Sequence, residues 1–269
     1  MQSKILCPSI LLLAIAFPTA AFAWGPDGHR IVALIATARL TPEAAAKVKQ
    51  LLGSQTLADV ASWADDIRND RPQTAAWHYV DIPTSQPSFD EKRDGNGGDN
   101  VVDAIEYYEK YIGQKQYDAR YRAEALKFLV HFVGDVHQPL HSTERDHDKG
   151  GNTRLVFFLD EPRAINLHSV WDSSILLHQM GTTNINVFAS SLNLRISSAQ
   201  AVDWAKGTPE DWANESHGVC LQVVYPGVPE DGPPPKLNEE YVKRGEQAID
   251  QQLQRAGVRL AQAINEGLN

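Results

Sequence analysis

A short apolar stretch in the middle of the chain contains side chains that could bind a metal ion. It runs from Leu126 to His141 and includes His131 and Asp135, which are four residues apart. Residues with this spacing share one face of an α-helix, so both side chains would point into the protein core. Burial of such groups is unfavourable unless they are paired or coordinate a metal, and zinc accepts imidazole and carboxylate ligands. The stretch therefore predicts a metal site, and the simpler alternative is a helix whose histidines are hydrogen-bonded in the core.

The same spacing recurs further along the chain in His168 and Asp172, again between apolar residues. The chain has nine histidines, so one such pair could arise by chance, whereas two are harder to dismiss. His29, Asp65 and His78 lie upstream and supply additional side chains of the same chemistry. Together these residues offer ligands for more than one ion, and the sequence predicts a polynuclear metal site.

The elements that would carry these residues are mostly α-helices, because apolar residues recur with helical spacing over most of the chain. We expect helices at 29–39, 42–52, 56–67, 100–112, 119–136, 168–179, 184–194, 208–223 and 238–264. Residues 154–159 are the best candidate for a strand and would form a short hairpin with the residues around Ile165. Loops are expected at 83–100, 144–152 and 226–235. The predicted fold class is all-α with a short β-hairpin.

The N-terminal residues have the layout of a secretory signal peptide. Lys4 precedes an apolar run, and Ala21 and Ala23 have the small side chains typical of a cleavage site. We therefore expect a signal peptide at 1–23 and one mature domain at 24–269, exported to the periplasm or the extracellular space without a membrane anchor. Cys7 lies in the leader, so Cys220 would have no partner for an intrachain disulfide.

The charge balance restricts the partners of this domain. The formal net charge of −9 argues against a broad basic surface for duplex DNA or an anionic membrane, because neutralising many phosphates needs clustered lysine and arginine. An anionic substrate held by metal cations is still compatible with this charge, since carboxylate ligands contribute to it. We expect the protein to be a monomer.

Several uncommon motifs follow one another in a fixed order. They are Trp24-Gly25 with Gly28-His29, Ala61-Ser62-Trp63-Ala64-Asp65, His78-Tyr79-Val80-Asp81, His131-Phe132-Val133-Gly134-Asp135, Gln138-Pro139-Leu140-His141, Gly150-Gly151-Asn152 and His168-Ser169-Val170-Trp171-Asp172. This order closely resembles the S1/P1 nuclease family. The resemblance implies a mainly helical, phospholipase C/P1 nuclease-like fold and three zinc ions at the bottom of a cleft.

The resemblance also implies the zinc ligands. One ion would be held by Asp65, His78, His131 and Asp135, a close neighbour by His29, Asp135 and Trp24, and a third ion by His141, His168 and Asp172. Trp24 would bind through its α-amino nitrogen and carbonyl oxygen. An α-amino group has a reference pKa of about 8, so it can be a neutral ligand near neutral pH, but only after signal cleavage. Asp66 beside Asp65 is an alternative ligand, and His137 is either a partner of the ligands or a surface residue.

Phosphodiester hydrolysis needs an activated water and neutralisation of the phosphate charge. Zinc lowers the pKa of bound water from 15.7 toward about 7, so a zinc-bridged hydroxide is the expected nucleophile. Asp81 would orient this nucleophile, and Arg68, one turn after Asp65, would bind phosphate oxygens, with Arg71 as an alternative. Tyr79 would stack on a base and Asn152 would contact the substrate, as the resemblance implies, although core packing and a plain turn are the alternatives.

The sequence therefore predicts a zinc-dependent endonuclease. Its substrates would be single-stranded DNA and RNA, cut to products with a 5′-phosphate, with a possible 3′-nucleotidase activity on nucleotides. A zinc phospholipase C is the closest rival, because enzymes of that type share the same ligand pattern and fold. An exported, non-catalytic zinc-binding protein is an alternative of another class, but a third site with only three protein ligands favours an enzyme.

Overall fold

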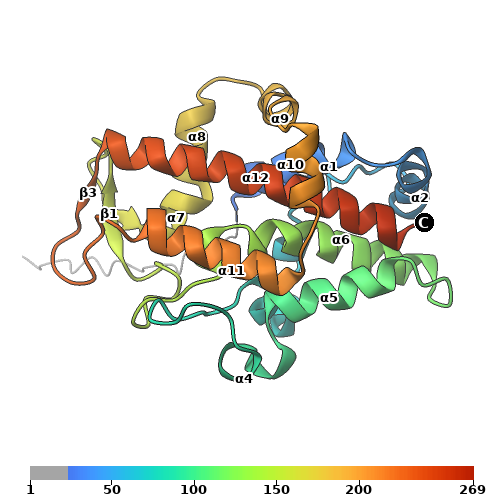
Figure 1. Ribbon diagram of the computed structural model, residues 1–269, viewed down its shortest axis with the longest axis horizontal. Helices are drawn as coiled ribbons and strands as arrows, with labels where there is room; N and C mark the ends of the chain where they lie inside the picture. The colour runs from blue at the N-terminus through green and yellow to red at the C-terminus, as the bar shows by residue number, and fades with distance from the viewer. Residues whose placement is uncertain (1–23) are drawn as a thin grey trace, which may run out of the picture.

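The computed structural model describes residues 24–269, which are mainly helical (Figure 1). The predicted signal peptide, residues 1–23, lies outside the described residues. The α-helices of the described range are α1 (Pro26–Thr37), α2 (Pro42–Leu52), α3 (Trp63–Asp66), α4 (Glu91–Asp94), α5 (Val101–Ile112), α6 (Ala119–Val136), α7 (Leu167–Ser169), α8 (Ile175–Met180), α9 (Ile185–Leu194), α10 (Ser198–Trp204), α11 (Pro209–Val219) and α12 (Glu239–Gly267). The 3-10 turns are η1 (Pro72–His78), η2 (Asn96–Gly98) and η3 (Pro139–His141). The π-helical turns are η4 (Val170–Ser174) and η5 (Cys220–Val224). The predicted all-α class is confirmed.

The long C-terminal helix α12 lies at the centre of the helical packing. It contacts α1, α5, α6 and α8, while α5 and α11 pack beside α6. Figure 1 shows α12, α11, α6 and α5 running roughly side by side along the long axis of the molecule. Helices α1, α5, α11 and α12 all contact α6. The second half of α6 is therefore buried without interruption from Phe128 to Val136. The helix that carries His131 and Asp135 is therefore the core helix of the fold.

A small sheet lies at one end of the helical layer (Figure 1). Strand β1 (Leu155–Phe158) pairs antiparallel with β2 (Ile165–Asn166), as the sequence predicted. A further strand, β3 (Lys236–Leu237), pairs in parallel with β1. It follows directly after the expected loop at 226–235, and its pairing depends on a partner far away in sequence. For that reason the sequence pattern did not reveal it.

Several predicted elements are wrong in extent. Only α3 is helical in the expected helix at 56–67. Thr56 and Asp59 exchange the reciprocal hydrogen bonds of a capping box, but the residues after them form turns until α3 begins. The expected loop at 83–100 contains α4 and η2, and the expected helix at 168–179 is divided into α7, η4 and α8. Helix α10 and the turn η1 were missed, although Ser197 and Gln200 form a capping box that marks the start of α10.

The apolar residues do not form a membrane-spanning element in the described range. None of the helices in residues 24–269 combines the length and the hydropathy needed to cross a bilayer. The longest of them, α12, is amphipathic and buries Ile249, Leu253 and Leu260 against its neighbours.

Candidate metal centre

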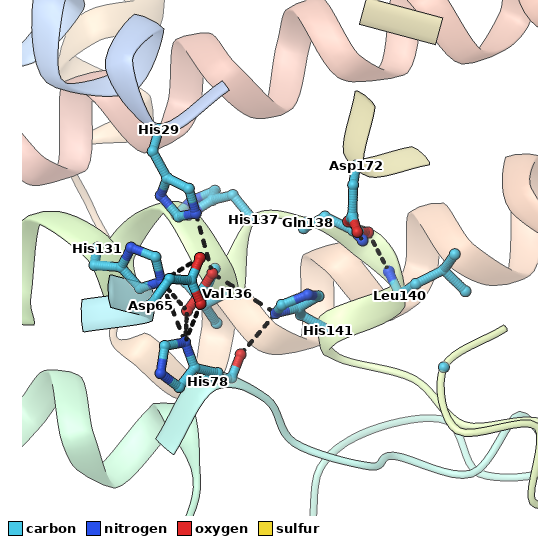
Figure 2. Close-up of polar contacts among 12 residues, drawn as sticks. His29, Asp65, His78, His131, Val136, His137, Gln138, Leu140, His141 and Asp172 are labelled. Atoms are coloured by element: carbon cyan, nitrogen blue, oxygen red, sulfur yellow. Dashed lines mark hydrogen bonds and ion pairs between the residues drawn. The ribbon is translucent and has the colours of Figure 1, made fainter. Parts of the chain in front are cut away.

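Buried histidines and aspartates from six parts of the fold meet at one place. They come from α1, α3, η1, α6, η3 and the α7–η4 segment. Within residues 24–269 they form three groups of potential metal ligands, namely His29 with His131 and Asp135, Asp65 with His78 and His131, and His141 with His168 and Asp172. Figure 2 shows His29, Asp65, His78 and His131 close together, with His141 and Asp172 to one side. The side chains in these three groups are imidazoles and carboxylates, and none of the groups contains a cysteine.

The Asp135 carboxylate lies between the histidines of the first two groups. Its Oδ1 atom is 3.4 Å from His29 Nε2, and its Oδ2 atom is 3.0 Å from His78 Nδ1 and 3.2 Å from His131 Nε2. The side chain of Asp65 faces the same imidazoles, at 3.7 Å from His78 Nδ1. Because each oxygen of Asp135 faces a different group, this residue has the geometry of a carboxylate that bridges two cations.

The imidazoles are oriented by bonds to backbone carbonyls on their outer side. His131 Nδ1 lies 2.8 Å from Ala61 O, His141 Nδ1 lies 2.7 Å from His78 O, and His168 Nδ1 lies 2.6 Å from Gly150 O. An Nδ1–H that donates to a carbonyl leaves Nε2 as a lone-pair donor, which is the usual arrangement around a bound metal. The Nε2 atoms of His141 and His168 then face each other at 3.1 Å. Two lone pairs at this distance are unfavourable unless a proton or a cation lies between them.

Other polar atoms of the cluster are buried without a hydrogen-bond partner in the described structure. They are both ring nitrogens of His29, Asp65 Oδ1, His78 Nε2 and Asp135 Oδ1. An orphaned buried polar atom costs roughly 1–3 kcal/mol, and more when it is charged. A concentration of such atoms in one place therefore fits cations such as zinc, which would satisfy the side-chain donors that face them.

Glycines allow the elements to approach closely at two points of the centre. A Cβ atom on Gly134 would lie 2.6 Å from His29 Nδ1, so the absent side chain lets the His29 ring lie against α6. Gly150 has a positive φ of 59°, and a Cβ atom there would lie 2.4 Å from Leu140 O. The Gly150 carbonyl can thus reach His168, which makes the Gly-Gly turn a part of the site.

Burial and charge give the groups different protonation states. Burial lowers the pKa of His141 to about 4 and of His168 to about 3, so both candidate ligands are neutral at neutral pH. Burial also holds the pKa of Asp172 well above its usual range. Burial alone would lower the pKa of His131, but Asp135 and Asp65 raise it to about 9. Binding of cations would therefore displace protons from the centre, as expected for a site whose ligands must be deprotonated.

A pocket of about 480 Å³ opens directly onto the centre. It is lined by the candidate ligands His78, His141 and His168 and by the predicted catalytic and substrate-binding residues, namely Arg68, Tyr79, Asp81 and Asn152. The pocket brings all four of these side chains together, although Arg68, the Tyr79–Asp81 segment and Asn152 are separate in the chain. Glu144 and Lys149 also line it, and sequence reasoning missed both because they lie in an expected loop without a motif.

Asp81 occupies an acidic part of this pocket. Its side chain is accessible to solvent, yet the surrounding walls remove part of its hydration. This desolvation, together with repulsion from Glu144, Asp148 and Asp94, raises the pKa of Asp81 to about 6. A carboxylate with this pKa changes its charge close to neutral pH, which suits a group that handles protons.

The structure distinguishes residues that the sequence left ambiguous. Asp65 is buried and faces the histidines, whereas Asp66 is exposed. Arg68 lines the pocket with Nη1 3.7 Å from Asp65 Oδ1, whereas Arg71 is paired with Glu124 away from it. These positions favour Asp65 and Arg68 over their neighbours.

The remaining histidines lie apart from the three groups. His137 is buried and bonded to Val133 O at 2.7 Å and to Arg259 Nη1 at 2.9 Å, so the surface alternative for it is wrong. His217 is buried against Thr143, while His147 is exposed. None of these three histidines belongs to a group of potential metal ligands among the described residues.

Trp24 is completely buried beside the start of α1. A Cβ atom on Gly28 would lie 2.8 Å from Trp24 Cβ, so the glycine allows the tryptophan to fold back over the first helical turn. The next residue, Gly25, donates a backbone hydrogen bond to Asp172 O at 2.9 Å. The residue that signal cleavage would expose is thereby held between α1, which carries His29, and the segment that carries Asp172.

Comparison with known proteins decides the family. The S1/P1 nuclease family model matches residues 24–269. The chain belongs to the S1/P1 nuclease family. Among its relatives, nuclease P1 from Penicillium citrinum is 32% identical over 90% of this chain and 97% of its own length. Endonuclease 2 from Arabidopsis thaliana is 32% identical over 90% and 89%, and nuclease S1 from Aspergillus oryzae is 28% identical over 96% of each chain.

The predicted family is confirmed, and with it the expectation of a nuclease enzyme. In this S1/P1 nuclease the candidate ligands and the pocket residues belong to the matched region. One residue that carries no assigned role from the sequence is Gln138, which the structure places beside the third group. Its Nε2 donates to Asp172 Oδ1 at 2.6 Å, and its Oε1 accepts from Leu140 N at 2.7 Å (Figure 2).

Gln138 therefore links Asp172 to the short turn that carries His141. Replacing it in Q138L removes both hydrogen bonds while keeping a buried side chain of similar size. We expect the affinity of the third group for zinc to fall by about 10- to 100-fold, the usual effect of losing a partner that orients a ligand. Competition with a chelator, followed by measurement of bound zinc, checks this. Q251L, at an exposed glutamine of α12, is the control, and equal zinc affinity in the two variants would contradict the orienting role.

Proposed function

We propose that this protein is an exported, tri-zinc nuclease that hydrolyses single-stranded DNA and RNA to 5′-phosphate products, with an additional 3′-nucleotidase activity. The observation that carries the proposal is the pocket. In it, Arg68, Tyr79 and Asp81 lie next to histidines of the candidate metal centre. The relatives named nuclease P1 and nuclease S1 support it. Residues 24–269 would form one catalytic domain after removal of residues 1–23.

The geometry supports the following distribution of three zinc ions. The first would be bound by Asp65, His78, His131 and Asp135, the second by His29, Asp135 and the processed terminus of Trp24, and the third by His141, His168 and Asp172. His131 lies within reach of both of the first two groups, but its Nδ1 is used by Ala61 O, so it has one nitrogen to offer. That nitrogen lies 3.2 Å from Asp135 Oδ2, on the side of His78, which supports its place in the first set.

Bound zinc would supply an activated water and positive charge against the phosphate oxygens. Asp81 would accept a hydrogen bond from the attacking water and so fix its direction. The Arg68 guanidinium can donate two parallel hydrogen bonds to non-bridging phosphate oxygens. Its positive charge also offsets the negative charge of Asp81 and Glu144 in the pocket wall. The third group has three protein ligands, which leaves room for a substrate oxygen, as in catalytic rather than structural zinc sites.

Tyr79 and Asn152 would hold the nucleotide. The Tyr79 side chain is 43% exposed although it is aromatic, so its ring is available for stacking on an unpaired base. A base inside a duplex is already stacked on both faces, which would explain a preference for single strands. Asn152 Nδ2 donates to Lys149 O at 2.8 Å and so braces the turn that carries Gly150. Asn152 would therefore contact the substrate through its amide oxygen.

A comparison of two substrates tests this function. Zinc-loaded protein that begins at Trp24 is incubated with denatured DNA and with phosphatidylcholine, and the released 5′-phosphates and diacylglycerol are measured. We expect cleavage of the DNA only. Hydrolysis of lipid without cleavage of DNA would establish the phospholipase C alternative, and no hydrolysis of either by a fully zinc-loaded protein would favour the non-catalytic zinc-binding alternative.

The N-terminus offers a second test. A protein that begins at Trp24 is compared with one that carries a single additional glycine before it. We expect the extended protein to lose the amino-terminal ligand, to bind its second zinc more weakly and to cleave single-stranded DNA at least about 10-fold more slowly, since ligand loss typically costs this much or more. Zinc content by mass spectrometry and initial cleavage rates are the measurements. Equal zinc content and rate in both forms would refute Trp24 as a ligand.

Asp81 leads to a prediction on pH dependence. Because the pKa of Asp81 is raised to about 6, its carboxylate form is present above that pH and is lost as the pH falls through it. Turnover should therefore decrease on the acid side, at or below about pH 6, since nearby cations favour the charged form. D81N should lower kcat by about 100-fold and abolish this pH limb.

The control for this prediction is D66N, which neutralises an exposed aspartate outside the pocket. Bound zinc is measured at each pH, because protonation of the ligands would also reduce the rate. A D81N enzyme with the wild-type rate and the wild-type pH profile would show that Asp81 does not position the water.

A further inference from the structure

A second hollow, separate from the metal centre, lies beside helix α5. Its volume is about 670 Å³, larger than the pocket at the centre. Its walls are aromatic and acidic side chains from η1, α5 and α6 and the residues before α5, and they include Trp77, Tyr107, Tyr108, Tyr111, Tyr121, Asp99, Asp103, Glu106 and Lys110. We call it the tyrosine groove. Among the described residues, the lining of this groove and the lining of the pocket at the centre have no member in common.

The aromatic rings form a preassembled platform. The Tyr107 and Tyr111 rings, one turn apart on α5, are 4.4 Å apart between centroids, and the Tyr107 and Tyr121 hydroxyls are hydrogen-bonded at 2.8 Å. Tyr108 stacks on the core residue Phe128 at 4.7 Å and anchors the platform to α6. Tyr107 is nevertheless 47% exposed. Rings that are held in place and open to solvent are typical of recognition surfaces.

The charges around the rings favour a cation. The carboxylates of Asp99, Asp103 and Glu106 line the groove, against the one ammonium group of Lys110. Arg71, which lies near the groove, is already paired with Glu124. Lys110 itself places Nζ 5.6 Å from the centroid of the Tyr111 ring, so the groove already shows an ammonium group over an aromatic face. A phosphate group would meet three carboxylates and is disfavoured.

We propose that the tyrosine groove binds an organic ammonium ion, such as a quaternary amine or a polyamine. Aromatic faces attract such cations through their quadrupoles, and the attraction is stronger when the cation is partly desolvated. The carboxylates at the rim would bind the charge, while the Trp77, Tyr107 and Tyr111 rings would cover the methyl or methylene groups. This inference does not depend on the proposed nuclease reaction, because the groove and the metal centre are lined by different residues.

Calorimetric titration of the zinc-loaded protein with choline chloride and with spermidine tests the proposal. The variants are Y107L and Y111L, which keep an apolar side chain but lose the ring face, and E106Q, which removes one charge. We expect each variant to weaken binding by about threefold to thirtyfold, and E106Q to reduce the dependence of binding on salt as well. Cleavage of single-stranded DNA should be unchanged in all of them.

Y117L is the matched control. The Tyr117 ring lies 5.2 Å from the Tyr111 ring and 4.9 Å from the Tyr121 ring, so it belongs to the same aromatic cluster but does not line the groove. It should bind the ammonium ions like the unaltered protein. A general loss of packing in the cluster would instead weaken Y117L and Y107L equally, which would overturn the proposal.

Two further outcomes would also overturn it. One is the absence of saturable binding of both cations at millimolar concentration. The other is tighter binding of neutral adenosine than of choline, with loss of adenosine binding in Y107L, because the groove would then be a site for a base. Sedimentation with phosphatidylcholine vesicles distinguishes a lipid head group from a free amine as the source of the cation, and vesicle binding that is lost in Y107L would identify the head group.

Discussion

The carboxylate of Asp135 is the group on which the organisation of the centre depends. It is fully buried on the core helix α6 and lies within 3.4 Å of nitrogens of His29, His78 and His131. A buried charge of this kind is stable only if it is surrounded by opposite charge or by donors. Contacts with these histidines hold its pKa well below the usual range even though burial alone would raise it. The elements around α6 therefore bring candidate ligands to this one carboxylate.

This constraint explains features of the fold that are otherwise unusual. Helix α1 approaches α6 so closely that only glycine fits at position 134, because the His29 ring occupies the place of a side chain. The end of α6 turns sharply at Gln138, which brings His141 back toward the same centre. The helix that contains Asp172 widens into the π-helical turn η4, which is a common deviation at functional sites. Local departures from regular structure therefore concentrate where ligands must converge.

The centre and the pocket above it have complementary electrostatics. The first two groups hold ionised carboxylate beside protonated imidazole, while burial keeps His141 and His168 neutral. Cations that bound there would replace the protons of the first two groups and of Asp172, so the net charge of −9 is compatible with a substrate that is itself an anion. The tyrosine groove has no such set of ligands and presents aromatic rings and three carboxylates, with Lys110 as the one ammonium group. The same acidic chain can thus have two concave surfaces that favour opposite charges.

Much of the helical structure and of the candidate ligand set could be predicted from the sequence, because both depend on the spacing of nearby residues. The His131 to Asp135 spacing and the run of apolar residues around it determined both the helix α6 and the side of it that carries the ligands. The order of the motifs was sufficient for the family, and the bounds of α2 and α6 were predicted to the residue. Helix periodicity and capping depend on residues within one or two turns of each other, so these signals are visible in a single sequence.

Only the tertiary structure decided between neighbours that are equivalent in sequence. Asp65 and Asp66, or Arg68 and Arg71, have the same chemistry. Packing buries Asp65 and exposes Asp66, and it places Arg68 at the pocket while Arg71 pairs with Glu124. The bond from Gln138 to Asp172 and the meeting of Trp77 with Tyr107 and Tyr121 join residues far apart in the chain. Such contacts depend on how whole helices pack, and no local pattern encodes their register. The sequence therefore determined which chemistry is present, and packing determined which residues are placed to perform it.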